Sequence, residues 1–476
     1  MANPLLLIHP RAIEWSEAAR LRLCQVEKSP ANPLFREESR AKPPKAWEAR
    51  LDNVYPNVVY DEDEQLFKCW YKSFIEDEAS SSTALADRRA VSYYGGEREE
   101  GLLYATSRDG IHWDKPRLGI INFAGSSQNN IVMRRATHGL HAGGVLKDEN
   151  DPDLARRYKF IHRNPRLGRM ASCFSADGLR WSQPQPWPQH DAVGDTHNNA
   201  LWSPEIDRYV CITRGWSADA FRGVRTVLRS ESRDFRHWSQ PVEILRGAGA
   251  HDQIYSMPIA RYQDLYIGLP AIFHKGDENA ADWDCVDTEL AVSSDTSEWR
   301  RICPGEPLIP RGDGAYPDGA ADCGCIYAAA PFVHRGEIYI FYGGSNGRHN
   351  DWREGSLNLA TLPLDRFAGY APRQDSQTAL IRTVPLRMTG RQLRLNAQVS
   401  RGGGLRATII NQAGEAVAGL SLDDCPAIRG DGASLPLRWC DKTVASLGAQ
   451  PFRLLLELRK AVVYSVKGCA RASGRE

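Results

Sequence analysis

The sequence predicts an all-β protein, and three observations support this prediction. A turn of the form Ser-x-Asp-x-x-x-Trp recurs along the 476 residues, as SRDGIHW, SADGLRW, SRDFRHW and SSDTSEW. Each copy follows short runs of β-branched and aromatic residues bounded by Asp, Gly and Pro, which is the pattern of strands. The chain also contains 40 glycines, 28 prolines and 13 tryptophans, which indicates many turns between aromatic-rich strands.

The repeats predict a five-bladed β-propeller. In each unit, two apolar strands joined by a polar hairpin precede the strand that enters the turn. These strand pairs span residues 57–74, 143–163, 200–215, 257–269 and 328–344. The aromatic residues that close the turns are Trp113, Trp181, Trp238, Trp299 and, in a degraded fifth copy, Phe367. Three strands, a turn and a short fourth strand form a blade, and five blades close into a ring without exposed edges.

The aspartates of the repeated turns are predicted to be structural. An Asp in such a turn accepts hydrogen bonds from the backbone that follows it, so its presence needs no catalytic role. The prediction covers Asp109, Asp177, Asp234 and Asp295.

The flanking segments predict two further parts of the chain. Residues 12–29, AIEWSEAARLRLCQVEKS, have helical spacing, and a Pro-rich extended stretch follows them. We therefore expect a short N-terminal helical and extended segment at 1–44, followed by the propeller at 45–372. The segment 374–469 alternates apolar and polar residues between Gly turns, and this pattern predicts a C-terminal β-sandwich.

Composition excludes several classes of partner. Because 60 Lys and Arg residues balance 59 Asp and Glu residues, neither nucleic acid nor an anionic membrane is an expected partner. The apolar runs are too short to cross a bilayer, and the N-terminus lacks the features of a secretory signal. The 11 cysteines include no C-x-x-C pair, so we expect reduced thiols and a cytoplasmic location. Assembly into a homo-oligomer stays open.

Propeller geometry predicts where chemistry can occur. Residues just before the innermost strands, and residues near the start of the third strands, gather at one face of the central channel. Carboxylates stand before successive inner strands, at Asp52, Asp195, Asp252 and Asp322. Glu289 lies beside the third strand of the fourth unit. These five residues are the candidate catalytic groups.

Basic and aromatic side chains are expected at the same face, as substrate-binding groups. Arg163, Arg214 and His274 follow second strands, and His141, His197 and Tyr255 lie near the channel. No cofactor and no metal is predicted. His141 or His197 with an aspartate are the candidates for a channel metal, but neither shows a ligand spacing.

Several carboxylates among arginines, histidines and aromatic residues suit glycosidic cleavage. One carboxyl group must stay protonated to give its proton to the leaving oxygen, while another must be ionised to attack the anomeric carbon or to activate a water. Neighbouring arginines lower a carboxyl pKa and neighbouring carboxylates raise it. A small-molecule carbohydrate is therefore the predicted partner, and Asp195, Asp252 and Asp322 are predicted to be central.

The turns SRDGIHW and SRDFRHW look like the S-x-D-L-x-x-W turn of glycoside hydrolase family 32. With the predicted propeller and sandwich, the chain from about residue 45 onward resembles the five-bladed glycoside hydrolases of families 32, 43, 68 and 117, closest in layout to family 32. The places of that family's N-D-P-N-G, R-D-P and E-C-P motifs read DNVYPNV (52–58), HRNP (162–165) and YSMP (255–258). The resemblance therefore implies a divergent branch in which the nucleophile's Asp is either Asp52 or missing and the acids lie in units three to five.

The predicted function is a glycoside hydrolase acting on a small glycoside or oligosaccharide, with furanosides among the candidates. One alternative is a phosphorylase or transglycosidase on the same scaffold; in the phosphorylase, Arg163 and Arg214 would bind phosphate. Another is a carbohydrate-binding propeller without catalytic activity.

Overall fold

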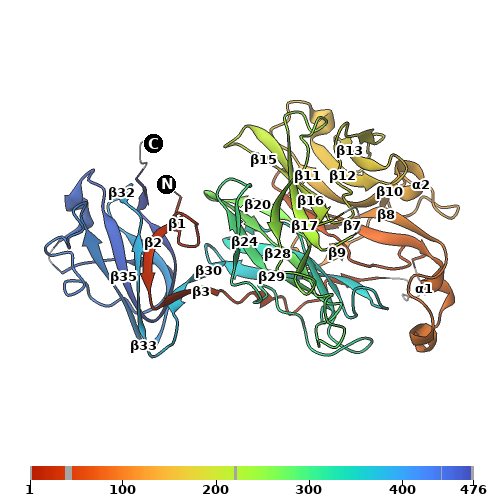
Figure 1. Cartoon of the computed structure of the whole chain (residues 1–476). Coiled ribbons are helices and arrows are strands. Elements are labelled where there is room, and N and C mark those ends of the chain that lie inside the picture. The colour runs from red at the N-terminus through yellow and green to blue at the C-terminus, as the bar shows by residue number, and fades with distance from the viewer. Residues whose placement is uncertain (1–2, 38–44, 219–221, 441, 473–476) are drawn as a thin grey trace.

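The computed structural model describes residues 3–37, 45–218, 222–440 and 442–472 (Figure 1). Within these ranges the chain is almost entirely β-structure, and its two α-helices are short. The helices are α1 (Glu78–Ser82) and α2 (Arg135–His138), and the 3-10 turns are Leu85–Ala90, Leu154–Arg156 and Val444–Leu447. None of these helices is long and apolar enough to cross a membrane. The predicted all-β propeller fold is confirmed.

Four antiparallel sheets stand as separate blades; in three of them the strands follow one another in sequence order, and in the first β9 and β10 both pair with β8. The first contains β6 (Asn57–Asp61), β7 (Leu66–Asp77), β8 (Arg98–Ser107), β9 (Trp113–Asp114) and β10 (Ile131–Arg134). The second contains β11 (His141–Lys147), β12 (Tyr158–Asn164), β13 (Arg169–Ser175) and β14 (Gln185–Pro186). The third contains β15 (Asn199–Ser203), β16 (Arg208–Trp216), β17 (Arg225–Ser232) and β18 (Val242–Arg246). The fourth contains β20 (Ile259–Tyr262), β21 (Leu265–Gly268), β24 (Leu290–Ser293) and β25 (Trp299–Ile302).

The fifth predicted unit belongs to a larger, nine-stranded sheet. Its strands are β26 (Cys325–Ala328), β27 (Phe332–His334), β28 (Glu337–Ser345) and β29 (Gly355–Pro363). A single parallel bridge between Val286 and Cys325 joins them to strands from the preceding unit, namely β19 (Gln253–Ser256), β22 (Ala271–Phe273) and β23 (Val286–Thr288). On the other side, β29 pairs with β4 (Glu27–Lys28) and β5 (Phe35–Arg36) from the N-terminal segment.

The repeated turns are built as the sequence predicts. In the first copy, the Ser107 hydroxyl accepts from the backbone N–H groups of Asp109 and Gly110. The Asp109 carboxylate in turn accepts from the N–H groups of Ile111 and His112, both at 2.8 Å. The same bonds recur in the other three copies. The structural role predicted for the four turn aspartates is confirmed.

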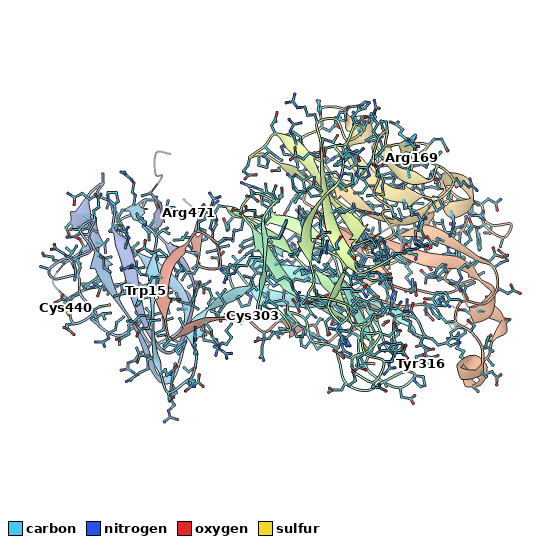
Figure 2. All side chains as sticks on the ribbon, in the orientation of Figure 1. Trp15, Arg169, Cys303, Tyr316, Cys440 and Arg471 are labelled. Atoms are coloured by element: carbon cyan, nitrogen blue, oxygen red, sulfur yellow. The ribbon has the colours of Figure 1, made fainter. Side chains whose placement is uncertain are left out.

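The expected helix at residues 12–29 is wrong, because this segment forms strands. Its strands β2 (Ile13–Glu17) and β3 (Ala19–Leu23) pair with β31 (Thr378–Thr383) and β30 (Ala368–Pro372). Trp15 accordingly lies on the C-terminal sheet, well apart from Arg169 of the propeller (Figure 2). Pairing with a distant sheet edge outweighs the local helical spacing, as tertiary contacts commonly do.

The C-terminal part is an eight-stranded sheet that includes strands from the N-terminal segment (Figure 1). Besides β2, β3, β30 and β31 it contains β1 (Leu5–Leu6), β33 (Arg394–Ile410), β34 (Gly430–Pro436) and β35 (Arg453–Lys467), while β32 (Leu386–Met388) pairs with β36 (Cys469–Arg471). Its core is a cluster of buried aliphatic side chains distinct from the propeller clusters. The sandwich and the bounds 45–372 and 374–469 stay predictions.

Candidate active site at the inner-strand starts

A polar cavity of about 270 Å³ opens where successive inner strands begin. Its walls come from the segment before β6, from β7, β8, β11 and β19, from the segment before β15, and from the connection between β28 and β29. Its charged and histidine side chains are Asp52, Lys72, Arg98, Glu100, Arg135, His141, Asp195, His349 and Arg353. The cavity therefore draws together parts of the chain that lie up to three hundred residues apart in sequence.

One side of the cavity is a line of three titratable groups. His141 Nδ1 lies 2.8 Å from Glu100 Oε1, and its Nε2 lies 2.6 Å from Asp195 Oδ1. A doubly protonated imidazole can donate to both carboxylates. Burial opposes the charge on the ring, but the two carboxylates outweigh burial, and the pKa of His141 is raised. The geometry thus favours an imidazolium between two carboxylates.

Both carboxylates of this line are held ionised. Burial raises the pKa of Glu100, but Lys72 and His141 outweigh it and bring the value to about 2. Lys72 Nζ lies 3.4 Å from Glu100 Oε1. For Asp195, burial is likewise outweighed by the hydrogen bond from His141 and by the charge of Arg214, so its pKa lies well below the usual range.

A third carboxylate, Asp52, lines the same cavity. Its Oδ1 accepts hydrogen bonds from Tyr93 Oη and Arg353 Nη2, and its side chain is 12% exposed against 1% for Arg353. Burial raises its pKa, but Arg353, Lys72 and Arg50 outweigh burial and hold it well below the usual range. Among the described residues no hydrogen bond reaches Oδ2 of Asp52, which leaves that oxygen available to a ligand.

These groups can perform acid and base catalysis. The ionised Asp52 and Asp195 can each act as base or nucleophile, and neither stores a proton. The raised pKa makes His141 the group that can give one. The cavity therefore combines a proton donor with carboxylates that stay charged at neutral pH.

The structure brings part of the predicted site together. Asp52, Asp195, His141 and Tyr255 line the cavity. Arg214 lies directly behind them, where it donates to the Tyr255 carbonyl at 2.8 and 3.0 Å and approaches Asp195 at 3.4 Å.

His197 is buried one layer deeper. Its Nε2 lies 3.2 Å from Asn57 Oδ1. Burial lowers its pKa to about 3, so it is a neutral part of the packing beneath the cavity.

Asp252 and Glu289 are placed elsewhere, because a shared arginine holds them. Arg301 Nη1 lies 2.6 Å from Asp252, and Arg301 Nη2 lies 2.8 Å from Glu289. Neither carboxylate lines the cavity. Asp252 lies directly before a strand, as predicted, but this position does not determine which way its side chain points.

Asp322 also lies outside the cavity. Its Oδ2 accepts from Lys28 Nζ at 2.6 Å and from Tyr342 Oη at 2.8 Å. Lys28 belongs to β4, within the segment expected to be helical. Because that segment is not a helix, the sequence pattern did not predict Lys28 as the partner of Asp322. The structure therefore does not bring Asp195, Asp252 and Asp322 to one place.

The two remaining predicted binding residues are peripheral. His274 Nε2 pairs with Asp287 at 2.8 Å. Arg163 lines a separate pocket of about 450 Å³ beside Arg169 and His190. Neither lines the cavity.

Sequence reasoning missed several residues of the cavity, above all Glu100, Lys72, Tyr93 and Arg353. Glu100 stands near the start of the third strand of its unit, and the rule that selected Glu289 would have selected it too. Lys72 lies within the long second strand, β7. Arg353 comes from the irregular connection SNGRHNDWRE, which carries no periodic signal.

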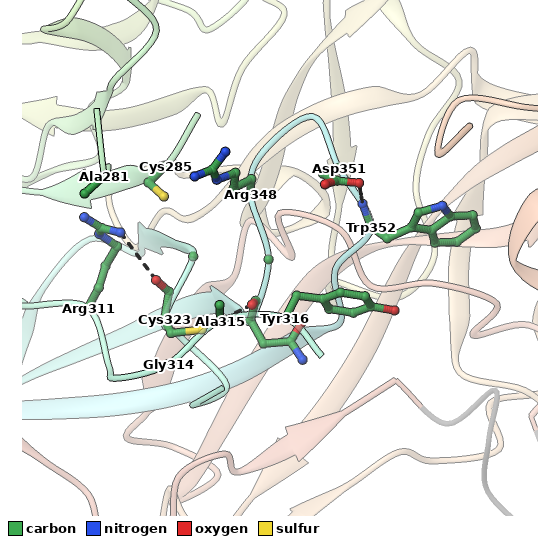
Figure 3. A pocket seen from close by; sticks show the side chains of 13 residues that line it. Ala281, Cys285, Arg311, Gly314, Ala315, Tyr316, Cys323, Arg348, Asp351 and Trp352 are labelled. Atoms are coloured by element: carbon green, nitrogen blue, oxygen red, sulfur yellow. Dashed lines mark hydrogen bonds between the residues drawn. The ribbon is translucent and has the colours of Figure 1, made fainter. Parts of the chain in front are cut away.

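A second pocket has a volume of about 430 Å³ (Figure 3). Arg311, Arg348 and Cys323 line it, and Trp352 lies at one end. Trp352 packs edge-on against Tyr93, with ring centroids 5.8 Å apart. Tyr93 lines the first cavity and Trp352 lines the second pocket, so this ring contact connects the walls of the two.

A metal centre is not evident in the part of the chain that the structure describes. That part contains no group of three or more His, Cys, Asp or Glu side chains placed to hold a metal ion. Cys323 and Cys325 instead direct their sulfur atoms at backbone carbonyls.

Comparison with known proteins gives a likeness of fold only. No known protein family and no curated protein matches the chain. Among solved structures, a putative glycoside hydrolase from Parabacteroides distasonis is 14% identical, with a TM-score of 0.47, over 71% of this chain and 97% of its own. The β-1,2-mannobiose phosphorylase from Listeria innocua is 11% identical, with a TM-score of 0.48, over 72% and 98%. A member of the GH130 family of mannoside phosphorylases and hydrolases is 14% identical, with a TM-score of 0.48, over 72% and 95%. At this level of similarity we derive no activity from these structures.

Proposed function

We propose that the chain is a glycoside hydrolase that cleaves a small glycoside or oligosaccharide in the cavity at the inner-strand starts. The supporting observation is the Glu100–His141–Asp195 line, which shares one cavity with the separately held Asp52. We also propose that β26–β29, with β4 and β5 on their edge, serve as the fifth blade of the ring.

The proposed reaction uses His141 as the acid and Asp52 as the base. His141 gives its proton to the glycosidic oxygen as the bond from that oxygen to the anomeric carbon breaks. Oδ2 of Asp52 takes a proton from a water whose oxygen bonds to the same carbon. Transfer of this proton back to His141 restores the starting state. Glu100 and Asp195 orient the imidazole and stabilise its charge.

Turnover of aryl glycosides by matched variants tests the proposal. A panel of furanosides and pyranosides is assayed with and without phosphate, using wild type, Asp52→Asn, His141→Asn and Asp195→Asn. We expect each variant to lose at least about a hundredfold in kcat, the scale of a lost acid or base. Asp207→Asn is the control, because Asp207 is exposed in a hairpin with φ of 54°, a conformation that Asn adopts equally well.

Three outcomes would contradict the proposal. Loss of activity in Asp252→Asn or Asp322→Asn, with the cavity variants unaffected, would move the site elsewhere. Turnover that requires phosphate would identify a phosphorylase. Sugar binding without cleavage of any glycoside in the panel would favour the carbohydrate-binding alternative.

A further inference from the structure

The cavity contains more permanent cations than carboxylates. Four Lys or Arg side chains line it against three carboxylates. The cations are Lys72, Arg98, Arg135 and Arg353. His141, with its raised pKa, adds to the positive side. A partly buried surplus of positive charge is costly unless an anion compensates it.

The surplus is concentrated on one side, around Phe74 and Glu100. Lys72 Nζ lies 4.7 Å and the Arg98 guanidinium carbon 5.2 Å from the centre of the Phe74 ring. Arg135 is close enough to help lower the pKa of Glu100. Glu100 thus faces Lys72 and Arg135, and it also binds His141.

Arg135 acts on Glu100 only at a distance, through its charge. It is half-buried and lines the cavity at the start of α2, and within the described residues its side chain makes no hydrogen bond and no ion pair. The charge of Arg98 is only weakly paired with a carboxylate, since its Nε lies 3.8 Å from Asp77. Its Nη2 donates a hydrogen bond to the Tyr93 carbonyl. The guanidinium groups of Arg135 and Arg98 can therefore donate further hydrogen bonds at the cavity wall.

Two further arginines, Arg214 and Arg225, lie behind the cavity wall at Tyr255, and Arg214 is paired with Asp195. Arg214 and Arg225 both lie on the Tyr255 ring, at 3.9 and 5.4 Å from its centre. Arg225 donates to Gln253 Oε1 at 2.8 Å, and no carboxylate pairs with it in the described chain. Burial and the neighbouring Arg214 lower the pKa of Arg225 to about 10.

We propose that the ligand of this cavity bears an oxyanion, bound between Arg135, Arg98 and Lys72. The inference rests on the proposed function and names its substrate class, namely glycosides of acidic sugars with a carboxylate group. Arginine donors recognise such groups by paired charged hydrogen bonds. Free inorganic phosphate has the same chemistry, so the experiment must separate an oxyanion on the sugar from one in solution.

Calorimetric titration of the full chain tests this without requiring turnover. The probes are galacturonate and glucuronate, with galactose and glucose as matched neutral sugars, and inorganic phosphate alone. We expect at least one acid to bind about tenfold more tightly than its neutral counterpart, with an affinity that falls as salt rises. Arg135→Gln should remove about tenfold of that affinity and leave neutral sugars unaffected. Arg180→Gln is the control, because Arg180 is 72% exposed in a repeated turn.

Each result has a defined meaning. Acid binding that depends on Arg135 supports an acidic sugar, and phosphate binding that depends on Arg135 supports an oxyanion taken from solution. Binding of neither acid nor phosphate, or affinities unchanged in Arg135→Gln, overturns the inference. Because no hydrogen bond or ion pair of the Arg135 side chain is found among the described residues, thermal unfolding should show Arg135→Gln folded as wild type. Acid binding without any glycoside cleavage would leave this inference standing and refute the hydrolase proposal.

Discussion

Substitution of Arg353 is expected to destabilise the whole chain, because it leaves Asp52 buried without its main partner. The Arg353 side chain is 1% exposed, and it also donates to Asn53 Oδ1 and to the Arg348 carbonyl, each at 3.0 Å. Removing one member of a buried ion pair costs about 3–5 kcal/mol. Arg353→Gln should therefore lower the free energy of unfolding by about that amount at pH 7.

A double-mutant cycle measures the interaction itself. Asp52→Asn removes the charge that Arg353→Gln leaves uncompensated, so the double variant should be more stable than the sum of the two single losses predicts. We expect a coupling energy of roughly 1–3 kcal/mol from urea unfolding, within the range for contacting residues. Arg180→Gln, on the exposed turn, should change stability by less than about 0.5 kcal/mol.

The effect should also depend on pH with a definite sign. The folded pKa of Asp52 is depressed, so its ion pair stabilises the fold fully above the unfolded value of about 4. This contribution is lost as pH falls through the folded value. The difference between wild type and Arg353→Gln should thus shrink below about pH 4. Additive single losses, or a difference that grows on acidification, would refute the reasoning.

Three further predictions concern the cavity and its support. The folded pKa of His141 is raised, so the extra stability of wild type over His141→Asn should be full below about pH 6.5 and should decline as pH rises through the folded pKa. Urea unfolding at several pH values measures this stability difference. A difference that widens above pH 7 contradicts the prediction. In Gly144→Ala the new Cβ would lie 1.9 Å from the Asn198 carbonyl oxygen, so thermal unfolding should show a loss of about 1–3 kcal/mol, whereas Gly390→Ala, whose nearest atom is 3.5 Å away, should unfold as wild type. Tyr94→Ala removes an aromatic ring that is 55% exposed at the cavity, so steady-state kinetics should show KM rising about tenfold with kcat retained.

Local signals in the sequence predicted what local bonds determine. The Ser and Asp of each repeated turn bond within five residues of themselves, so the turns could be recognised without knowing the rest of the fold. The strands at 13–23 could not, because their partners lie some three hundred and fifty residues later. An isolated segment with helical spacing contains no information about such a sheet edge.

The same distinction separates the site residues that were found from those that were missed. Asp52 and Asp195 stand just before inner strands, and that position alone selected them. It selected Asp252 and Asp322 too, although their side chains meet Arg301 and Lys28 instead. Whether a carboxylate faces the cavity depends on which cation it pairs with, and those cations come from segments distant in sequence.

The buried charges also bear on the choice between an enzyme and a binding protein. Glu100 and Asp52 are 3% and 12% exposed at the side chain, so keeping both ionised requires Lys72, Arg353 and the other cations around them. A site that only bound neutral sugar hydroxyls could use neutral amides and hydroxyls, which cost far less to bury. Groups whose pKa values are driven apart in one cavity are the arrangement that proton transfer requires. Here the pKa values of the carboxylates are lowered and the pKa of His141 is raised, and this separation supports the proposal that the cavity is catalytic.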